Sequence, residues 1–339
     1  MSNDILIIGC GSIGGLKEDK YDRPNGKNIL TLAHAFYNNS NTNKLIFYDK
    51  NINKAKQAAI KWNGFYCTNL KFAITDFFPE IIVIAVNTKY HEEVLWEIYK
   101  LLNECILNTK TNNSYKPQLM IVEKPFTTNY EEALNISINF ESINVPIMID
   151  YSRRFDPTIQ KLQRKIFNRD LDPIYNAVLT YTRGFKRDAS HGIDLFNYLF
   201  GKCLGGQLLN KNNSFCDFSK EDPTYAAYLS YEQCPHVFLV PVDGRDYDIF
   251  DLTIYAKKSK HVFTDHGKRY MSYLARPELT YGNYDSMSTE PIYTEETSLT
   301  SSLSLLTKNA FDFIHKGSKL LCTDRNAINV HEVFKKLGI

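Results

Sequence analysis

The sequence predicts an α/β Rossmann fold, a doubly wound parallel sheet, followed by a C-terminal α+β domain with an open, mainly antiparallel sheet. Two observations predict the first domain: short β-branched runs alternate with segments of helical periodicity, and the glycine fingerprint Gly9-Cys10-Gly11-Ser12-Ile13-Gly14 follows the first run. A third predicts the second domain, because longer alternating strands replace this pattern after residue 151. At 339 residues the chain exceeds the usual size of one hydrophobic core, and we place the domains at residues 1–150 and 151–339.

Five strands and four helices are expected in the first domain. The strands are residues 5–9, 44–48, 81–86, 119–123 and 146–149, and the helices between them are residues 28–37, 53–62, 91–102 and 130–138. Strand-helix-strand connections of this kind are right-handed and place helices on both faces of the sheet, so a doubly wound sheet follows.

The second domain is expected to begin with a helix at residues 158–167 and to continue with alternating strands. These strands are residues 174–181, 225–230, 236–242, 249–255 and 260–264, the last two joined as a hairpin. Residues 297–315 and 329–337 have helical spacing, and the last helix could pack back on the first domain. The free face of the antiparallel sheet could hold a substrate or a partner subunit.

Composition and charge exclude several classes of function. The 43% hydrophobic and 23% charged residues are typical of a globular protein, and a net charge of +2 gives no electrostatic basis for binding nucleic acid or an anionic membrane. Seven cysteines without a CxxC pair indicate free thiols in a reducing compartment, so a cytoplasmic location is expected. The strand-like start leaves no room for a signal peptide, and the apolar runs are far shorter than the roughly 20 residues of a membrane helix. His261, Asp265 and His266 are too loosely spaced for a metal site, and no metal is predicted.

The glycine fingerprint is typical of a dinucleotide site. Without side chains at its first two glycines the chain can turn tightly and approach a pyrophosphate, whose charge meets the amides of a helix N-terminus. Asp49 closes the second strand, where its carboxylate can accept hydrogen bonds from a ribose 2′-hydroxyl. Asp49 lies beyond the usual spacing of about 20 residues, which we attribute to a polar surface loop at residues 16–27 that could also cover the cofactor. A glycine turn in a protein without a nucleotide is the alternative.

Asp49 also predicts which dinucleotide binds. A carboxylate repels a 2′-phosphate and therefore favours NAD, whereas the neighbouring cation Lys50 keeps NADP as the alternative. Asn87 and Thr88 follow the third expected strand and are predicted to lie near the cofactor, and His91 either joins them or packs at the start of its helix.

The tripeptide Glu123-Lys124-Pro125 ends an apolar run that is typical of a buried parallel strand. Ligands in open α/β sheets bind outside the carboxyl ends of such strands, so Lys124 is predicted to lie beside the cofactor. Hydride leaves a carbinol carbon only as the hydroxyl proton is removed, and a lysine whose pKa is lowered by burial and by a nearby positive charge can serve as the base. A salt-bridging surface lysine is the alternative.

A second candidate group precedes a helix in the second domain. Asp188 and His191 are one helical turn apart, and an imidazole there could pass on the proton that Lys124 takes. Capping of the helix by Asp188 or Ser190, with His191 in an ordinary packing role, is the alternative.

Five basic residues are candidates for contact with an anionic substrate group. Arg153 and Arg154 could hold such a group bidentately, or one of them ties the two domains together. Arg183, Lys186 and Arg187 lie beside the second candidate group and hint at a phosphate or carboxylate on the substrate. A solvated basic strand end is the alternative for these three.

Together these motifs resemble the Gfo/Idh/MocA family of oxidoreductases, named for glucose-fructose oxidoreductase and inositol dehydrogenase. The resemblance spans most of the chain and rests on four ordered motifs: Gly9-Cys10-Gly11-Ser12-Ile13-Gly14, Glu123-Lys124-Pro125, Tyr151-Ser152-Arg153-Arg154-Phe155-Asp156-Pro157 and Ser190-His191-Gly192-Ile193-Asp194-Leu195. It implies an N-terminal Rossmann domain, a C-terminal domain with an open antiparallel sheet, a nicotinamide cofactor, and sugars or cyclitols as the commonest substrates.

Carried over residue by residue, the resemblance makes Lys124 the lysine that touches the reacting hydroxyl and His191 the histidine of the proton relay. Asp188 completes the catalytic group, although many relatives place this acid four residues before the histidine, where this chain has Arg187. The residues expected to bind substrate are Lys124, Tyr151, Arg153, Arg187 and His191. Those expected to bind the cofactor are Gly9, Gly11, Ser12, Ile13, Gly14, Asp49, Asn87, Thr88, Glu123 and Lys124.

The sequence thus predicts an NAD(P)-dependent oxidoreductase that transfers a hydride between nicotinamide and a secondary alcohol or ketone of a sugar, including nucleotide-linked or acidic sugars. Surface-polysaccharide synthesis would suit such an enzyme. One alternative is a glycosidase that oxidises its substrate transiently, and another is a non-catalytic dinucleotide-binding sensor or scaffold. A homo-oligomer, dimer or tetramer, that pairs through the sheet of the second domain is expected.

Overall fold

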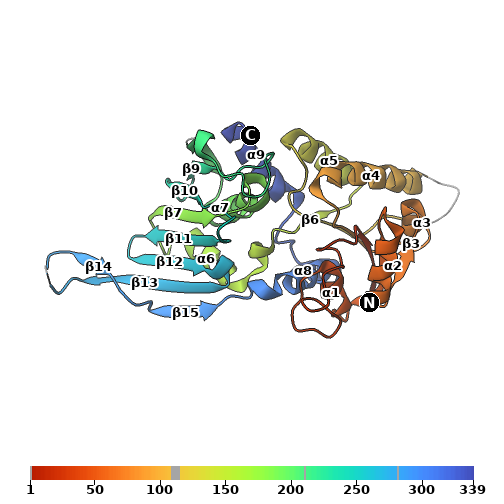
Figure 1. Cartoon of the computed structure of the whole chain (residues 1–339), viewed down its shortest axis with the longest axis horizontal. Coiled ribbons are helices and arrows are strands. Elements are labelled where there is room, and N and C mark those ends of the chain that lie inside the picture. Colours follow the sequence, from red (N-terminus) through yellow and green to blue (C-terminus); the bar gives the residue numbers. More distant parts are fainter. Residues whose placement is uncertain (1, 108–114, 210, 281) are drawn as a thin grey trace. The chain divides into compact units, whose positions relative to one another are not determined.

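The computed structural model describes residues 2–107, 115–209, 211–280 and 282–339. These residues form two compact units, Met1–Phe155 with Thr300–Ile328, and Asp156–Leu299 with Asn329–Ile339. The chain therefore enters the second unit after residue 155 and returns to the first for residues 300–328 (Figure 1). Within the described part of the chain, no helix combines the length and the apolar character needed to span a membrane.

The first unit is built on a six-stranded parallel sheet in the order β3-β2-β1-β4-β5-β6. Its strands are β1 (Asn3–Ile8), β2 (Thr42–Tyr48), β3 (Phe65–Cys67), β4 (Ile81–Ile84), β5 (Leu119–Val122) and β6 (Ile147–Ile149). Strands β4 and β5 consist of apolar residues only and are fully buried, as parallel strands between two helical layers must be. The strand order reverses between β1 and β4, and ligands of such sheets bind outside the carboxyl ends at this point.

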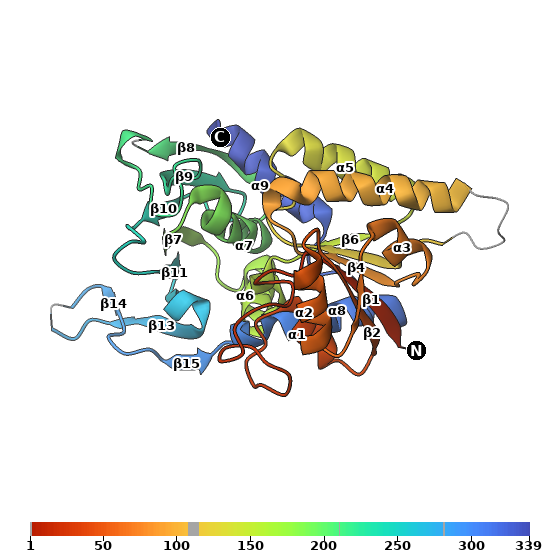
Figure 2. The ribbon, with the colours of Figure 1, turned by 45° about the vertical axis from the view of Figure 1, so that its right-hand side comes forward.

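Helices cover both faces of this sheet. They are α1 (Leu32–Tyr37), α2 (Ile52–Lys61), α3 (Leu70–Thr75), α4 (His91–Leu107), α5 (Tyr130–Ser142) and α8 (Ser302–Lys316). Helices α4 and α5 lie on one side of the sheet, and α1, α2 and α8 lie on the other (Figure 2). Phe311 of α8 meets Phe36 of α1 edge to face at 5.9 Å between ring centroids, a contact that contributes about 0.5–1.5 kcal/mol beyond its buried area.

The expected parallel sheet is confirmed, with two additional elements and one later helix start. Strand β3 and helix α3 were not expected, because β3 has three residues and two of them, Phe65 and Tyr66, are exposed at the sheet edge. A strand of three residues is too short to show an alternation of apolar and polar residues in the sequence. Helix α1 begins at Leu32 and not at residue 28, because Oγ1 of Thr31 accepts the amide of His34 at 3.2 Å and so caps the helix there.

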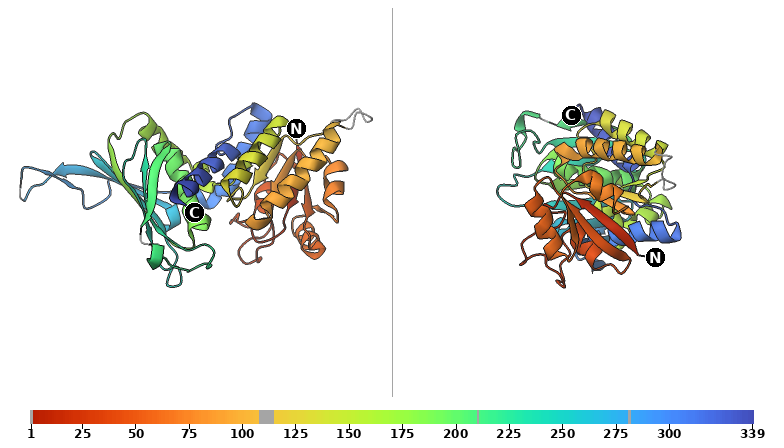
Figure 3. Two further views of the ribbon diagram at one scale, coloured as in Figure 1. Left: turned by 90° about the horizontal axis from the view of Figure 1, so that it is seen from above. Right: turned by 90° about the vertical axis from the view of Figure 1, so that its right-hand side faces the viewer.

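The second unit contains a nine-stranded sheet. Its strands are β7 (Ile174–Tyr181), β8 (Cys203–Leu209), β9 (Ala226–Tyr231), β10 (Val237–Pro241), β11 (Phe250–Ala256), β12 (Ser259–Thr264), β13 (Arg269–Pro277), β14 (Asp285–Met287) and β15 (Tyr293–Glu296). They lie in the order β14-β13-β12-β11-β7-β10-β9-β8, with β15 beside β13. Strands β7 and β10 run parallel and the other neighbours antiparallel. The hairpin that contains β14 extends away from the rest of this sheet (Figures 1 and 3). The expected antiparallel character of the second sheet is confirmed.

Helices α6 (Pro157–Phe167) and α7 (Ser190–Phe200) pack against each other in the second unit. Gly192 lets α7 approach β7 closely, because a Cβ atom on Gly192 would lie 2.2 Å from Cδ2 of Leu179. Buried residues alternate with half-buried or exposed ones along β7 and β9, so one face of the sheet is covered and the other is open. Helix α9 (Asp324–Leu337) begins in the first unit and ends in the second.

Candidate functional site

The glycine fingerprint forms a tight turn after β1. Gly9 has a φ of +92°, and a Cβ atom on it would lie 2.7 Å from the backbone of Ala85 and Val86. A Cβ atom on Gly14 would lie 1.9 Å from the carbonyl oxygen of Gly9. The fold itself therefore requires glycine at both positions.

Gly11 differs from these two glycines, because packing within the chain does not require it. A Cβ atom on Gly11 would meet no protein atom within 4 Å. The space beside it belongs to a cavity that Gly9 and Gly11 both line. Glycine next to open space is what the close approach of a ligand to the backbone needs, and this is where the motif places a pyrophosphate.

The turn also serves as the first turn of the helix that follows it. The amide of Leu32 donates to the carbonyl of Ile13 at 2.9 Å, and the amide of Ala33 donates to that of Gly14 at 3.1 Å. These two hydrogen bonds join residues 13 and 14 to the start of α1 as if they belonged to one helix. Residues 16–31 therefore form an insertion within that helix. The helix N-terminus expected behind the glycines is therefore built from two segments of the chain.

The inserted loop has a buried anchor. Asp22 is 1% exposed, accepts the amide of Leu30 at 3.3 Å, and lies 2.5 Å from Nδ1 of the buried His34. The indole of Trp62 packs beside the His34 ring and donates to the carbonyl of Gly15 at 2.8 Å. These contacts attach the loop to helix α1 and to the end of α2. The loop is therefore held by buried contacts and is not solvated along its whole length.

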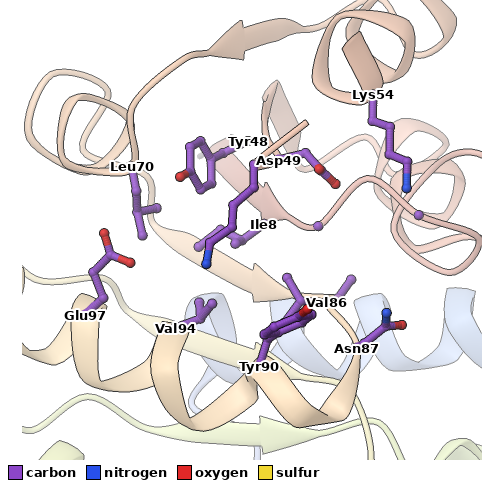
Figure 4. A pocket seen from close by; sticks show the side chains of 14 residues that line it. Ile8, Tyr48, Asp49, Lys54, Leu70, Val86, Asn87, Tyr90, Val94 and Glu97 are labelled. Atoms are coloured by element: carbon purple, nitrogen blue, oxygen red, sulfur yellow. The ribbon is translucent and has the colours of Figure 1, made fainter. Parts of the chain in front are cut away.

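A cavity of about 230 Å³ opens in the first unit at the carboxyl ends of β1, β2 and β4 (Figure 4). Of the predicted cofactor residues, the structure brings together at this cavity Gly9, Gly11, Asp49 and Asn87. The remaining ones do not line it: Ser12, Ile13, Gly14, Thr88, Glu123 and Lys124. Sequence reasoning missed several lining residues, which are Tyr48, Lys54, Leu70, Tyr90, Val94 and Glu97. Leu70 and Val94 come from α3 and α4, and only the folded sheet brings these helices to the cavity.

Asp49 is held in place by two backbone amides. Its Oδ2 accepts the amide of Cys10, and its Oδ1 accepts the amide of Asn51, both at 2.8 Å. The neighbouring Lys50 is engaged by Glu93, with 2.8 Å between Nζ and Oε1, and its ammonium lies 5.6 Å from the centre of the Tyr90 ring. The carboxylate therefore has a fixed orientation, and the adjacent cation has an acidic partner.

His91 links the loops that follow β4 and β5. Its ring is buried, with Nε2 3.0 Å from the carbonyl oxygen of Val86 and Nδ1 3.2 Å from that of Phe126. Burial lowers the pKa of His91 below its ordinary value. Of the two roles considered from the sequence, packing at the start of its helix is the one found.

Lys124 is the second residue after β5 and is half-buried. The amide of Glu123 donates to the carbonyl of Ile84 at 3.0 Å, which extends the pairing of β4 and β5 by one residue. Burial, and then the carboxyl group of Asp150, raise the pKa of Glu123 well above its ordinary value. Burial also raises the pKa of Asp150, against the lowering by Glu123 and by the charge of Lys124. An acidic pair that the sequence analysis did not identify thus lies beside Lys124.

Tyr151 and the two arginines lie just after β6. Tyr151 is 1% exposed and Arg154 is 4% exposed, whereas Arg153 is half-buried. They belong to a short 3-10 turn, Ser152–Phe155, and to the residue before it. Arg154 therefore has the environment of a structural residue, and Arg153 remains the candidate for substrate contact.

Asp188 and His191 both lie at the start of α7 and are half-buried. Asp188 belongs to a turn, Phe185–Ala189, whose backbone hydrogen bonds are of the π type. Ala189 occupies the N-cap position of α7, so neither Asp188 nor Ser190 is the N-cap residue. The side chain of Ser190 instead donates to the carbonyl of residue 187 at 2.9 Å.

Acidic side chains already engage the basic cluster before α7. The amides of Lys186 and Arg187 donate to Asp222 at 2.7 Å and 2.9 Å. The guanidinium group of Arg183 lies 3.1 Å from Asp248. Part of the positive charge and two amides are therefore occupied, which weakens the case for an anion site at Arg183. Arg187 is engaged as well, because its Nε lies 3.8 Å from Oδ1 of Asp188.

His261 has protein partners on both ring nitrogens. Nε2 lies 3.0 Å from the hydroxyl of Ser259, and Nδ1 lies 2.8 Å from the hydroxyl of Tyr270. Burial lowers the pKa of His261 to about 4. In the ranges that the structure describes, no group of three or more His, Cys, Asp or Glu side chains is placed to hold a metal ion.

No protein-family model matches the sequence, and no curated protein matches it. Solved structures match along its whole length at low identity. The WlbA dehydrogenase from Bordetella pertussis, in complex with NADH and UDP-GlcNAcA, has a TM-score of 0.72 at 13% identity over 100% of this chain and 96% of its own. The UDP-N-acetylglucosamine 3-dehydrogenase GnnA from Acidithiobacillus ferrooxidans has a TM-score of 0.69 at 13% identity over 99% and 98%.

An oxidoreductase from Agrobacterium radiobacter, in complex with NAD+, L-tartaric acid and magnesium, has a TM-score of 0.69 at 11% identity over 99% of this chain and 95% of its own. The chain therefore has the fold of these proteins.

Proposed function

We propose that the chain is an NAD-dependent oxidoreductase of the Gfo/Idh/MocA type that transfers a hydride between nicotinamide and a secondary alcohol or ketone of a sugar. The observation that carries the proposal is the open space beside Gly11, in a cavity that Asp49 also lines. Packing within the chain explains Gly9 and Gly14, whereas the open space beside Gly11 suits the close approach of a ligand to the backbone.

The solved structures of the same fold support both the cofactor and the substrate class. The Bordetella pertussis dehydrogenase is in complex with NADH and UDP-GlcNAcA, and the Agrobacterium radiobacter oxidoreductase is in complex with NAD+. GnnA is a UDP-N-acetylglucosamine 3-dehydrogenase. Since two of these three involve a nucleotide sugar, we propose nucleotide sugars as the first substrates to test.

The residues of the first unit fit a dinucleotide. The space beside Gly11 admits a pyrophosphate close to the backbone, at the start of the interrupted helix. Asp49 retains unused acceptor positions on both oxygens, which suit the hydroxyl groups of the adenosine ribose. Leu70 and Val94 supply apolar surface for the adenine ring at the other end of the cavity.

The same geometry favours NAD over NADP. A 2′-phosphate would meet a carboxylate that two amides hold in place, and Lys50 already has Glu93 as its partner. Asp49 would have to give up both hydrogen bonds to turn away from that phosphate, and hydrogen bonds to a charged group contribute about 1.5–3 kcal/mol each. We therefore propose NAD as the cofactor.

When bound, nicotinamide accepts or returns the hydride. Lys124 is proposed to contact the reacting hydroxyl and to take its proton as the hydride leaves, because it stands half-buried at the end of β5. A free lysine has a pKa of about 10.4, which burial and the positive charge of bound oxidised nicotinamide would lower. His191 and Asp188 of the second unit are proposed to pass the proton on, and Tyr151, Arg153 and Arg187 to bind the substrate.

Calorimetric titration of the purified protein with NAD and with NADP tests the cofactor. We expect binding of NAD, with NADP at least about tenfold weaker, a difference of 1.4 kcal/mol. Failure to bind either dinucleotide at millimolar levels would remove the proposal. Nicotinamide absorbance with a panel of UDP-sugars and free sugars then tests the reaction, and bound NAD that never turns over in bulk would favour the glycosidase alternative.

A further inference from the structure

Two acidic residues end two neighbouring strands of the first unit. Glu123 follows β5 and Asp150 follows β6, and the two strands pair with Val122 opposite Ile149. The amide of Asp150 donates to the carbonyl of Val122 at 3.0 Å. Both side chains therefore leave the sheet at the same level of its carboxyl edge.

The two carboxyl groups are hydrogen bonded to each other and largely withdrawn from water. Asp150 is 5% exposed and Glu123 is half-buried, and Oε1 of Glu123 and Oδ1 of Asp150 are buried without a hydrogen-bond partner in the described part of the chain. Two carboxylates in such contact repel each other, so the pair keeps one proton. Burial, and then Asp150, raise the pKa of Glu123 well above its ordinary value, and burial raises the pKa of Asp150.

Lys124 supplies the positive charge at this place. Its ammonium group lowers the pKa of both Glu123 and Asp150 and so acts on both carboxyl groups. The one negative charge that the pair carries thus lies beside one positive charge.

We propose that Glu123 and Asp150 share a single proton and act together as positioning residues for Lys124. The inference rests on the proposed function in one respect, that Lys124 contacts the reacting hydroxyl. During oxidation the O–H bond of the alcohol breaks and its proton passes to the amine of Lys124, while the hydride passes from the carbinol carbon to the oxidised nicotinamide. The fixed negative charge of the pair then balances the ammonium that forms, without any rearrangement of solvent.

Isosteric variants test whether one proton is shared. Asp150→Asn and Glu123→Gln each leave one carboxyl group, which carries the negative charge once its neighbour no longer repels it, whereas the double variant removes that charge. The readout is the titration midpoint of Lys124 in the full-length protein without dinucleotide, followed by NMR of 15N-labelled lysine side chains and assigned with Lys124→Arg. Loss of a nearby opposite charge shifts a pKa by about 1–3 units, so we expect the midpoint to fall by at least about one pH unit in the double variant.

The midpoint in each single variant is expected to stay within about 0.3 pH units of the wild type, because one carboxylate remains beside Lys124. Glu104→Gln, an exposed glutamate on α4, is the matched control. A midpoint that falls in a single variant as far as in the double variant, or that stays unchanged in the double variant, overturns the proposal.

Infrared spectroscopy tests the shared proton without relying on the Asp150 variant. At about pH 7 ordinary carboxyl groups are ionised, so the C=O stretch of a protonated carboxyl should be present in the wild type and in Glu104→Gln and absent in Glu123→Gln. If the wild type lacks this band, both acids are ionised and the pair does not exist. Neither measurement uses dinucleotide or substrate, so a failure here is distinct from a failure to bind NAD.

Discussion

The carboxylate of Asp49 accepts the backbone amide of Cys10 at 2.8 Å, and this bond ties the end of β2 to the glycine turn after β1. One residue thus fixes the spacing between the glycine turn and the end of β2, the proposed places of the pyrophosphate and the ribose. The bond exists because β1 and β2 are parallel neighbours, with Ile8 opposite Tyr48. The long insertion between these strands leaves that register unchanged.

Replacing Asp49 by Asn should change the choice of cofactor. The neutral amide no longer repels a 2′-phosphate and accepts the ribose hydroxyl less strongly, so we expect NAD affinity to fall by about tenfold or more while NADP affinity rises or stays level. Calorimetry on the variant and on Asp76→Asn, an acid at the end of α3 outside the cavity, measures the change. An unaltered NAD to NADP ratio would contradict the role given to Asp49.

Two glycines of the same turn should respond in opposite ways to an added methyl group. Gly14→Ala places a Cβ atom 1.9 Å from the carbonyl of Gly9, and we expect the free energy of unfolding to drop by about 3 kcal/mol or more. Gly11→Ala meets no protein atom, so its stability should stay level or rise by up to about 1 kcal/mol. NAD affinity should nevertheless fall at least about tenfold in Gly11→Ala. Urea unfolding and calorimetry measure the two effects, and retained NAD affinity in Gly11→Ala would show that the space beside it holds no ligand.

The parts of the site that follow from strand order could be predicted from the sequence, and those that depend on packing could not. Gly11, Asp49 and Asn87 each follow a predicted strand, and parallel strands bring their carboxyl ends together. Leu70 reaches the cavity on α3, a helix of six residues that leaves too little periodicity to detect.

Long-range contacts account for the other differences between the predicted and the observed structure. Helix α8 joins the first unit through the contact of Phe311 with Phe36. These two residues lie far apart in the sequence, and no local sequence pattern predicts that they meet. The acidic pair was missed for a related reason. Glu123 belongs to a motif of the sequence but Asp150 does not, and only the neighbouring positions of β5 and β6 make them partners.

Lys124→Ala should separate catalysis from cofactor binding. Loss of a general base lowers turnover by about a hundredfold or more, whereas the fold of the glycine turn and Asp49 remain, so NAD affinity should stay within about threefold of the wild type. The control is Lys116→Ala, an exposed lysine just before β5 that donates to the carbonyl of residue 144. Turnover is followed by nicotinamide absorbance with the sugar found active in the panel. Unchanged turnover in Lys124→Ala would mean that the base lies elsewhere.

The raised pKa values of Glu123 and Asp150 predict how stability depends on pH. An acid whose pKa is higher in the folded state binds more protons there than in the unfolded chain, so the free energy of unfolding falls as pH rises from the ordinary carboxyl range, about 4, through the folded pKa. For Asp150 this window ends at about 6, and for Glu123 it extends higher. Each proton contributes a slope of up to about 1.4 kcal/mol per pH unit.

Glu123→Gln removes one of these two titrating groups. The free energy of unfolding of the variant should therefore fall less steeply with rising pH, and the variant should be at least as stable as the wild type at about pH 8. Urea unfolding between about pH 5 and pH 8 measures this, with Glu104→Gln expected to keep the full slope. A Glu123→Gln variant that is less stable than the wild type at every pH would argue that Glu123 is ionised in the folded protein.

The buried contact between Asp22 and His34 should control the inserted loop. Asp22→Ala leaves a fully buried imidazole without its partner, which costs about 1–3 kcal/mol of stability, and it releases the amide of Leu30 as well. The loop contains several trypsin sites, which are Lys17, Lys20 and Lys27. Limited trypsin digestion should therefore cut the Asp22→Ala variant within residues 16–27 faster than the wild type. Asp19→Ala removes only an exposed carboxylate from Lys61, whose ammonium group keeps its bond to the carbonyl of Lys17, and should shift stability by no more than about 0.5 kcal/mol, with cleavage at the wild-type rate. Equal cleavage of both variants would show that the loop is held by its other contacts.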